Sequence, residues 1–211
     1  NAVTVDRMSE IMLLLQDRNA ENINLITADH YIPWVIDAVK LAKKNGLKIP
    51  IALNTSSFLT KETLEQLNGV IDIYLADFKY FDELTAKRMC GFSQYALYAK
   101  RAIKIMNEQV GGLKIDSGIA VKGLIIRHLI LPHYDSQAIK ILQWIKESFG
   151  TMVPISIMRQ YFPAYKAVQM NDLNRKVIDS EYNSVVREAA KQGLSGWTQE
   201  KDYDILMDDI S

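Results

Sequence analysis

An apolar segment, IDIYLADFKY at residues 71–80, carries two opposite charges near its end, Asp77 and Lys79. The pattern predicts a β-strand, in which alternation puts both charged side chains on one face and Phe78 on the other. In α/β proteins the carboxyl ends of the strands form the reactive face, so an acceptor and a donor would be offered together to a polar ligand. The alternative is a structural ion pair at the strand end with a solvated lysine.

A guanidinium inside an apolar run is the second such feature. Arg127 lies in GLIIRHLILP, residues 123–132, a run typical of a parallel strand that is covered on both faces. An unpaired guanidinium would be costly there, so we expect a carboxylate partner inside the fold or at its mouth. That partner is either a carboxylate of a ligand or Asp77 in an internal ion pair.

The elements that must position these residues alternate between helix and strand, about 25 residues apart, which is the size of a βα unit. Turn residues and apolar periodicity predict five parallel strands and a small hairpin at residues 114–121. The tail after Gly196 is expected to be partly ordered at best. The predicted strands are residues 22–28, 48–54, 71–79, 123–132 and 153–161, and the predicted helices include residues 32–45, a short helix after Thr60, and helices through Met8, Met106, Ile141 and Val185.

The composition limits the kinds of partner. The chain has 211 residues, 48% of them hydrophobic, with 25 basic and 25 acidic side chains. No block of like charge and no long uncharged apolar run stands out, so we expect neither nucleic acid nor a membrane as partner. A single cysteine, Cys90, excludes a framework of internal disulfides. Together with the lack of a visible signal peptide, it favours a cytoplasmic location. We expect the Cys90 thiol to be partly buried and inert. Three histidines without helical i, i+4 spacing argue against a zinc site.

Several segments, taken in order, resemble radical SAM proteins related to pyruvate formate-lyase activating enzyme. The resemblance implies one partial (βα)6 barrel domain over residues 1–211, with residues 196–211 as a C-terminal extension. It also implies binding of S-adenosylmethionine and a 4Fe-4S cluster, and hydrogen abstraction from a substrate, for which a protein is one possibility. The segments that carry it are TVDRMSEIMLLLQDRNAENINLITADHY, IPIALNTSSF, IDIYLADFKYFDELTAKRMCGF, GLIIRHLILP and MRQYFPAYKA.

The chain departs from this family in two ways. The CxxxCxxC loop that supplies three thiolates to the cluster is missing, and one cysteine cannot replace it. The chain also starts on a predicted helix, so the first barrel strand is missing, and Asn1-Ala2 could be a tag remnant. We therefore expect this chain alone to be inactive and its parent protein to carry out the radical step.

The resemblance also assigns roles at the strand ends. It implies that Asp77 and Lys79 contact the ribose and amino acid parts of S-adenosylmethionine, and that Arg127 binds its methionine carboxylate. Asn54 and Thr55, with Asp77, match oxygen ligands of a monovalent cation in activating enzymes, although asparagine carries less charge than the expected aspartate.

Two further strand ends have implied roles. Residues 27–30, from Thr27 to His30, occupy the place of a Gly-Gly-Glu turn that binds the amine of the cofactor. Asp29 could accept from this ammonium, or Asp29 and His30 could cap the following helix. Gln160 is a candidate contact for adenine or substrate together with Tyr161 and Tyr165, or these aromatic side chains close the base of the barrel.

Two other functions remain as alternatives. One is a redox-inert half-barrel that binds a nucleoside or a phosphorylated ligand. The other is a protein-docking module that uses the open sheet edge.

Overall fold

The computed structural model describes residues 3–199 and divides the chain into two compact units. Unit 1 comprises Asn1–Phe78 and Gln94–Ile126, and unit 2 comprises Lys79–Ser93 and Arg127–Ser211. The suggested tag remnant and most of the proposed C-terminal extension lie outside the described residues. The single domain over residues 1–211 stays a prediction.

Unit 1 contains the parallel strands β1 (Ile23–Ile26), β2 (Ile51–Thr55) and β3 (Ile73–Asp77). The first part of β5 (Ile119–Leu129) continues the sheet beside β3. β1 pairs with β2, and β2 with β3, in parallel register. These strands confirm the prediction from periodicity; β1, β2 and β3 are shorter than their predicted segments, whereas β5 begins earlier than predicted.

The predicted hairpin is also confirmed, since β4 (Lys114–Asp116) pairs antiparallel with β5. Its turn residues, Ser117 and Gly118, have φ angles of 50° and 87°. Two consecutive left-handed residues match the twist of the flanking strands.

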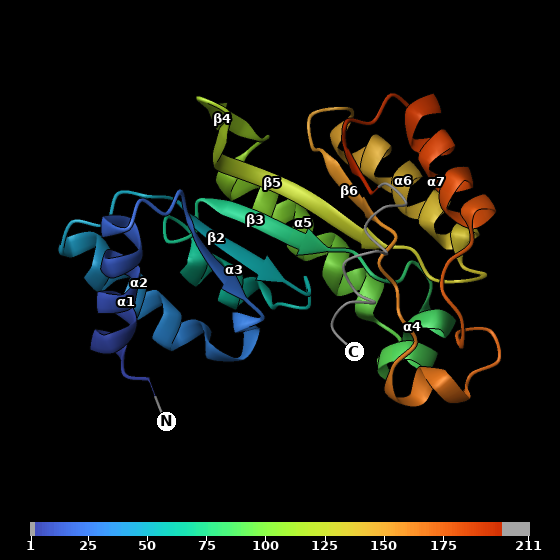
Figure 1. Cartoon of the computed structure of the whole chain (residues 1–211), viewed down its shortest axis with the longest axis horizontal. Helices are drawn as coiled ribbons and strands as arrows, with labels where there is room; N and C mark the ends of the chain where they lie inside the picture. Colours follow the sequence, from blue (N-terminus) through green and yellow to red (C-terminus); the bar gives the residue numbers. More distant parts are fainter. Residues whose placement is uncertain (1–2, 200–211) are drawn as a thin grey trace. The chain divides into compact units, whose positions relative to one another are not determined.

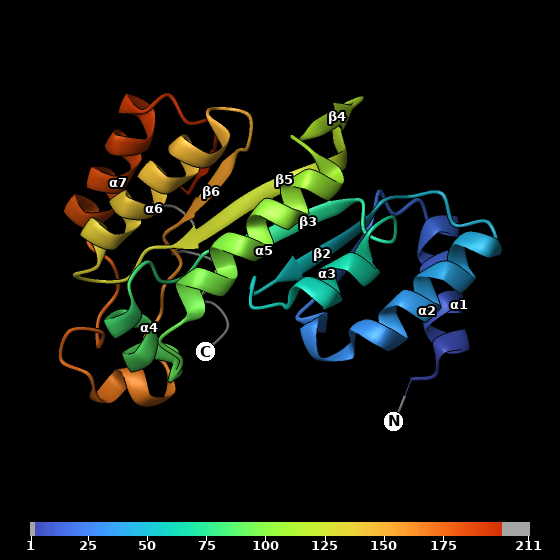
Figure 2. The ribbon, with the colours of Figure 1, turned by 180° about the vertical axis from the view of Figure 1, so that it is seen from behind.

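The helices of unit 1 bury an apolar stripe, and two of them, α1 and α3, begin at a capping threonine. The side chain of Thr4 accepts from the N–H of Arg7, and that of Thr60 accepts from the N–H of Thr63. Figure 2 shows α3 and α5 covering one face of β2 and β3. No described helix is long and apolar enough to cross a membrane. The helices are α1 (Val5–Asp17), α2 (Ile32–Lys44), α3 (Lys61–Leu67) and α5 (Tyr95–Val110).

The opposite face of the unit 1 sheet, which faces the viewer in Figure 1, is more open. Ile26, Asn54 and Leu75 form one row across the three strands. Ile26 is 68% exposed, and Asn54 and Leu75 are half-buried, whereas Leu53 and Tyr74 on the helix side are fully buried. Polar residues at the ends of these strands therefore lie beside a partly accessible face.

Unit 2 contains the last residues of β5, then β6 (Ile155–Met158) and β7 (Gly196–Thr198). β7 pairs in parallel with β6. Helices α6 (Asp135–Phe149) and α7 (Asp179–Lys191) pack together, and Figures 1 and 2 show them side by side. Shorter elements are α4 (Glu83–Cys90) and the 3-10 helix η2 (Tyr165–Gln169).

β7 lies at the start of the tail that was expected to be partly ordered at best after Gly196, and residues 200–211 of that tail lie outside the described residues. Gly196 has a φ of 146°, and a Cβ atom there would lie 1.8 Å from the carbonyl oxygen of Ile155. Only glycine allows this close approach to β6. The strand order runs from β1 to β7 without returning to β1, so residues 3–199 form an open α/β sheet of the partial-barrel kind.

The edge of β1 leads to a prediction about self-association. β1 is the first strand of the sheet, pairs with β2 on one side and carries the exposed Ile26. Edge strands with exposed apolar side chains promote pairing between molecules. We expect the chain to self-associate in light scattering and Ile26→Lys to reduce this, whereas Leu97→Lys on α5 should not. A strictly monomeric chain at high concentration would contradict this prediction.

Candidate functional site

In unit 1, a carboxylate after β1 reaches the end of β2. Asp29 lies in the 3-10 helix η1 (Ala28–Tyr31), which follows Thr27 in the left-handed conformation at φ 56°. Its Oδ2 accepts from the backbone N–H of Ser56 at 3.0 Å and from Ser56 Oγ at 2.7 Å. Its Oδ1 is buried and has no hydrogen-bond partner among the described residues. A buried carboxylate oxygen without a hydrogen-bond partner favours binding of a ligand that supplies a hydrogen-bond donor.

The capping alternative for Asp29 and His30 is wrong within the described residues. The N-cap of α2 is Tyr31, without a side-chain capping bond, and His30 is exposed. The Asp29 carboxylate faces the strand end, because the left-handed turn at Thr27 redirects the chain there.

A buried tyrosine joins the ends of β2 and β3. The hydroxyl of Tyr95, at the start of α5, lies 3.0 Å from the carbonyl oxygen of Ser56 and 3.1 Å from that of Asp77. One hydroxyl proton is thus shared between two backbone acceptors. Asp77 is the last residue of β3, so this contact holds the backbone that carries its carboxylate.

The side chains of Asn54 and Thr55 do not converge. Asn54 lies on the open face, whereas Thr55 is 2% exposed and its Oγ1 accepts from the N–H of Ser57 at 3.2 Å. Strand alternation directs these neighbours to opposite faces. No group of three or more His, Cys, Asp or Glu residues that could hold a metal occurs among residues 3–199. The cation site stays a prediction for Asn54 and Asp77.

In unit 2, a thioether lies between two candidate ligand residues. Arg127 Nη2 on β5 lies 3.6 Å from Met158 Sδ on β6, and Gln160 Nε2 lies 4.0 Å from the same sulfur. Arg127 is half-buried, and Gln160 is exposed just after the strand. The structure therefore brings Arg127 and Gln160 to the same end of their strands.

A residue that the sequence analysis did not select lies beside them. Gln199 follows β7, and its Oε1 accepts from the backbone N–H of Arg159 at 2.5 Å and of Gln160 at 3.2 Å. Its Nε2 donates to Gln160 Oε1 at 3.0 Å. The segment after β7 thus reaches the carboxyl end of β6.

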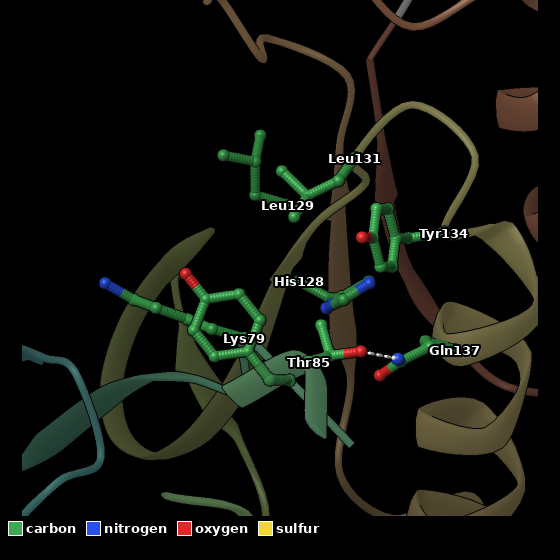
Figure 3. A pocket seen from close by; sticks show the side chains of 8 residues that line it. Lys79, Thr85, His128, Leu129, Leu131, Tyr134 and Gln137 are labelled. Carbon is green, nitrogen blue, oxygen red and sulfur yellow. Dashed lines mark hydrogen bonds between the residues drawn. The ribbon is translucent and has the colours of Figure 1, made fainter. Parts of the chain in front are cut away.

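Lys79 differs from the prediction. β3 ends at Asp77, so Lys79 lies beyond the strand and alternation no longer fixes its direction. It is exposed in unit 2, and Figure 3 shows its ammonium directed away from His128 and Gln137. Asp77 belongs to unit 1, so a joint role of the two charges stays a prediction, as does the ion pair between Asp77 and Arg127.

Lys79 lines a small cavity in unit 2, together with the last residues of β5, His128 and Leu129, and residues of neighbouring loops and helices (Figure 3). His128 is 4% exposed in its wall, whereas its neighbour on β5, Arg127, is half-buried. Gln137 holds the adjoining loop, since its Oε1 accepts from the N–H of Phe81 and its Nε2 donates to Asp82 and Thr85. The cavity has a volume of about 10 Å³, room for about one water molecule and none for a nucleoside.

Glu181, which the sequence analysis did not select either, holds two loops of unit 2 together. It accepts from both terminal nitrogens of Arg175, at 2.9 and 2.6 Å, and from the N–H groups of His133 and Ile178. The Arg175 guanidinium, followed by these backbone donors, lowers the pKa of Glu181 to about 2 against the effect of burial. His133 itself is exposed and has a φ of 66°.

A second charged cluster fastens α4 to the segment after η2. Arg88 binds both carboxylate oxygens of Asp172 at 2.5 and 2.6 Å, and the Tyr134 hydroxyl lies within 2.6 Å of Arg88 and 3.1 Å of Asp172. These bonds lower the pKa of Asp172 to about 2. The neighbouring Cys90 is exposed, which corrects the expected partial burial, because it lies in the last, outward-facing turn of α4.

The aromatic residues after β6 do not form a closed cluster. Tyr161 donates to the carbonyl oxygen of Leu173 at 3.0 Å, whereas Tyr165 is 83% exposed at a φ of 52°. Closure of the barrel base by both tyrosines is therefore wrong.

Sequence comparison identifies one relative but no family model. No model of a known protein family matches the sequence. An uncharacterised protein of Methanocaldococcus jannaschii is 30% identical over 177 residues, which are 83% of this chain and 48% of that protein. The chain thus spans about half of the length of this curated relative.

Solved structures share the fold at low identity. A domain of pyruvate-formate lyase-activating enzyme from Bacteroides vulgatus has a TM-score of 0.61 at 13% identity, covering 85% of this chain and 98% of that chain. SuiB of Streptococcus suis bound to S-adenosylmethionine has a TM-score of 0.61 at 14% identity, covering 95% of this chain and 44% of that chain. The protein anSMEcpe with bound AdoMet has a TM-score of 0.58 at 11% identity, covering 90% of this chain and 53% of that chain. These neighbours are radical SAM enzymes, and the chain has the open α/β fold of their partial barrels.

Proposed function

We infer that the chain is the partial-barrel core of a radical SAM enzyme related to activating enzymes, and that its strand ends bind S-adenosylmethionine. Two neighbours of the same fold carry this molecule, SuiB and anSMEcpe. The buried, unpartnered Oδ1 of Asp29 at the end of β1 is the observation that carries the proposal. It marks a place where the ammonium group of a ligand would donate the hydrogen bond that this oxygen lacks.

Each unit, taken by itself, carries candidate contacts for this ligand. In unit 1, Asp29 would accept from the ammonium, and Asn54 and Asp77 would face the sugar from the ends of β2 and β3. In unit 2, Arg127 would bind the carboxylate, Lys79 the amino acid or ribose part, and Gln160 the base. Turn geometry at Thr27 positions Asp29. These side chains orient the ligand, and none is required to transfer a proton.

The ammonium contact can be tested with two ligands. S-adenosylmethionine carries the amino acid group, and 5′-methylthioadenosine lacks it. We expect the chain to bind S-adenosylmethionine more tightly, and Asp29→Asn to reduce this difference by removing the charge that faces the ammonium. Calorimetric titration measures both affinities, with Asp17→Asn at the end of α1 as control. Equal affinities for the two ligands in the unaltered chain would contradict the contact.

The residues of this chain do not fit a 4Fe-4S cluster. Such a cluster in this family needs three thiolates, and the sequence has one cysteine. We therefore expect no stoichiometric cluster after anaerobic incubation with iron, sulfide and reductant, and no radical activity of this chain alone. Iron analysis and absorption spectroscopy measure the cluster content. Stoichiometric iron with the spectrum of a 4Fe-4S cluster would contradict the expectation, and Cys90→Ser would show whether Cys90 contributes.

Substrate and partner belong to the same proposal. SuiB and anSMEcpe have been solved with peptides, so a peptide or protein substrate is supported by analogy of fold. The activation of a glycyl radical enzyme is the more specific form of this proposal. A cytoplasmic location fits the single cysteine.

A further inference from the structure

Two side-chain amides meet at the carboxyl end of β6 in unit 2. Gln160 lies two residues after the last strand residue, Met158, and Gln199 lies one residue after β7. Gln199 Nε2 donates to Gln160 Oε1 at 3.0 Å. The pair joins a predicted ligand residue to one for which the proposed function has no role.

The hydrogen bonds of Gln199 fix which end of each amide faces which neighbour. Backbone N–H groups can only donate, and those of Arg159 and Gln160 both point to Gln199 Oε1, at 2.5 and 3.2 Å. The other end of Gln199 is therefore the NH₂ group, which must meet an acceptor. That acceptor is Gln160 Oε1, so the carbonyl of Gln160 is occupied from within the protein.

Gln199 is itself held in place by buried neighbours. Its backbone N–H donates to the Tyr182 hydroxyl at 2.6 Å, and that hydroxyl donates to the carbonyl oxygen of Ile157 at 3.2 Å. Tyr182 is 4% exposed on α7. The strand β7 precedes Gln199 directly and pairs with β6. The orientation is therefore set by the core of unit 2.

Gln160 is left with its NH₂ group for other partners. One described neighbour of this nitrogen is Met158 Sδ at 4.0 Å, a weak acceptor at the limit of a hydrogen bond. Gln160 is exposed, so a ligand can reach the amide. A ring nitrogen or a carbonyl oxygen is a stronger acceptor than a thioether.

We propose that Gln199 is a positioning residue that presents Gln160 to the ligand as a hydrogen-bond donor. The site then selects a base edge that offers an acceptor, such as a ring nitrogen of adenine, and disfavours its exocyclic amine. The choice of adenine rests on the proposed function. The orientation of Gln160 rests only on the contacts within unit 2.

The orientation is tested first without ligand. In ¹⁵N NMR spectra of the full chain, Gln199→Leu should shift the side-chain NH₂ resonances of Gln160 and increase their exchange with solvent. Gln199→Glu keeps an acceptor for the two backbone N–H groups but cannot donate, so Gln160 should turn its NH₂ group toward residue 199. Gln169→Leu on η2 is the matched control and should leave Gln160 unchanged. Unaltered Gln160 resonances in both Gln199 variants would overturn the proposal.

The ligand preference is tested with adenosine and its 1-deaza, 3-deaza and 7-deaza analogues. In the unaltered chain, at least one analogue should bind about five- to tenfold more weakly than adenosine, the effect of losing one hydrogen bond. Gln160→Leu and Gln199→Glu should each abolish this discrimination, while Gln169→Leu retains it. Discrimination that survives in Gln199→Glu would contradict the proposal. If adenosine does not bind at all, the adenosyl ligand and the proposed function fail, whereas the NMR measurement still decides the role of Gln199.

Discussion

Replacing Glu181 with leucine should lower the free energy of unfolding by about 3 kcal/mol, the cost of breaking a largely buried ion pair by removing one partner. The carboxylate is 10% exposed and pairs with Arg175, and it also accepts from the N–H groups of His133 and Ile178. Leucine satisfies none of these donors. Urea unfolding measures the effect, with Glu147→Leu, an exposed residue on α6, as control. Equal midpoints for Glu181→Leu and the unaltered chain would contradict this role.

The same contacts predict how stability depends on pH. Folding lowers the pKa of Glu181 from an ordinary 4.5 to about 2, so between these values the unfolded state binds more protons than the folded state. The stabilisation is complete above about pH 4.5 and is lost as the pH falls toward 2. Asp172, paired with Arg88, acts in the same direction. The unfolding free energy of Glu181→Leu should therefore change less over this range than that of the unaltered chain.

Arg127→Leu and Asp77→Asn should each weaken binding of S-adenosylmethionine by about 1–3 kcal/mol, the range for a lost charge-assisted hydrogen bond. Leucine keeps the apolar volume of Arg127 and removes the partner of the ligand carboxylate, while asparagine keeps the shape of Asp77 and removes its charge. Calorimetric titration measures the affinities. Arg101→Leu on α5 and Asp116→Asn on the β4–β5 hairpin are the matched controls.

A structural role for Arg127 and Asp77 predicts a different result. If affinity is unchanged in both variants while urea unfolding shows lost stability, Arg127 and Asp77 are structural residues. An ion pair between them predicts in addition that the effects of the two substitutions on stability are not additive.

The order of strands and helices could be predicted from the sequence because the long elements have their own apolar periodicity and some helices also have a capping residue. Thr60, for example, precedes α3 and caps it as expected. β7 could not be predicted in this way, since three residues are too few to show alternation, and its pairing depends on the close approach at Gly196. α4 was missed because only two of its eight residues, Thr85 and Ala86, are buried, so it shows no long apolar stripe.

The candidate site, like the fold, could be predicted only in part. The strand-end positions of Asp77, Arg127 and Asn54 follow from their own segments. The partners that fix the geometry come from far along the chain: Ser56 is 27 residues from Asp29, and Gln199 is 39 residues from Gln160. Tyr95 fits the apolar stripe of α5, and nothing in that pattern indicates that its hydroxyl joins β2 to β3. Such contacts depend on the packing of whole elements, which local sequence patterns do not encode.

Binding of S-adenosylmethionine at the carboxyl ends of the strands can be tested by an amide chemical-shift map of the chain titrated with this compound. We predict saturable shifts at Thr27, Asn54 and Ser56 in unit 1 and, as a separate observation, at Gln160 and Gln199 in unit 2. The α1 helix and the β4–β5 hairpin should remain unchanged. An absence of shifts at these strand ends, or shifts confined to the helices, would contradict the account.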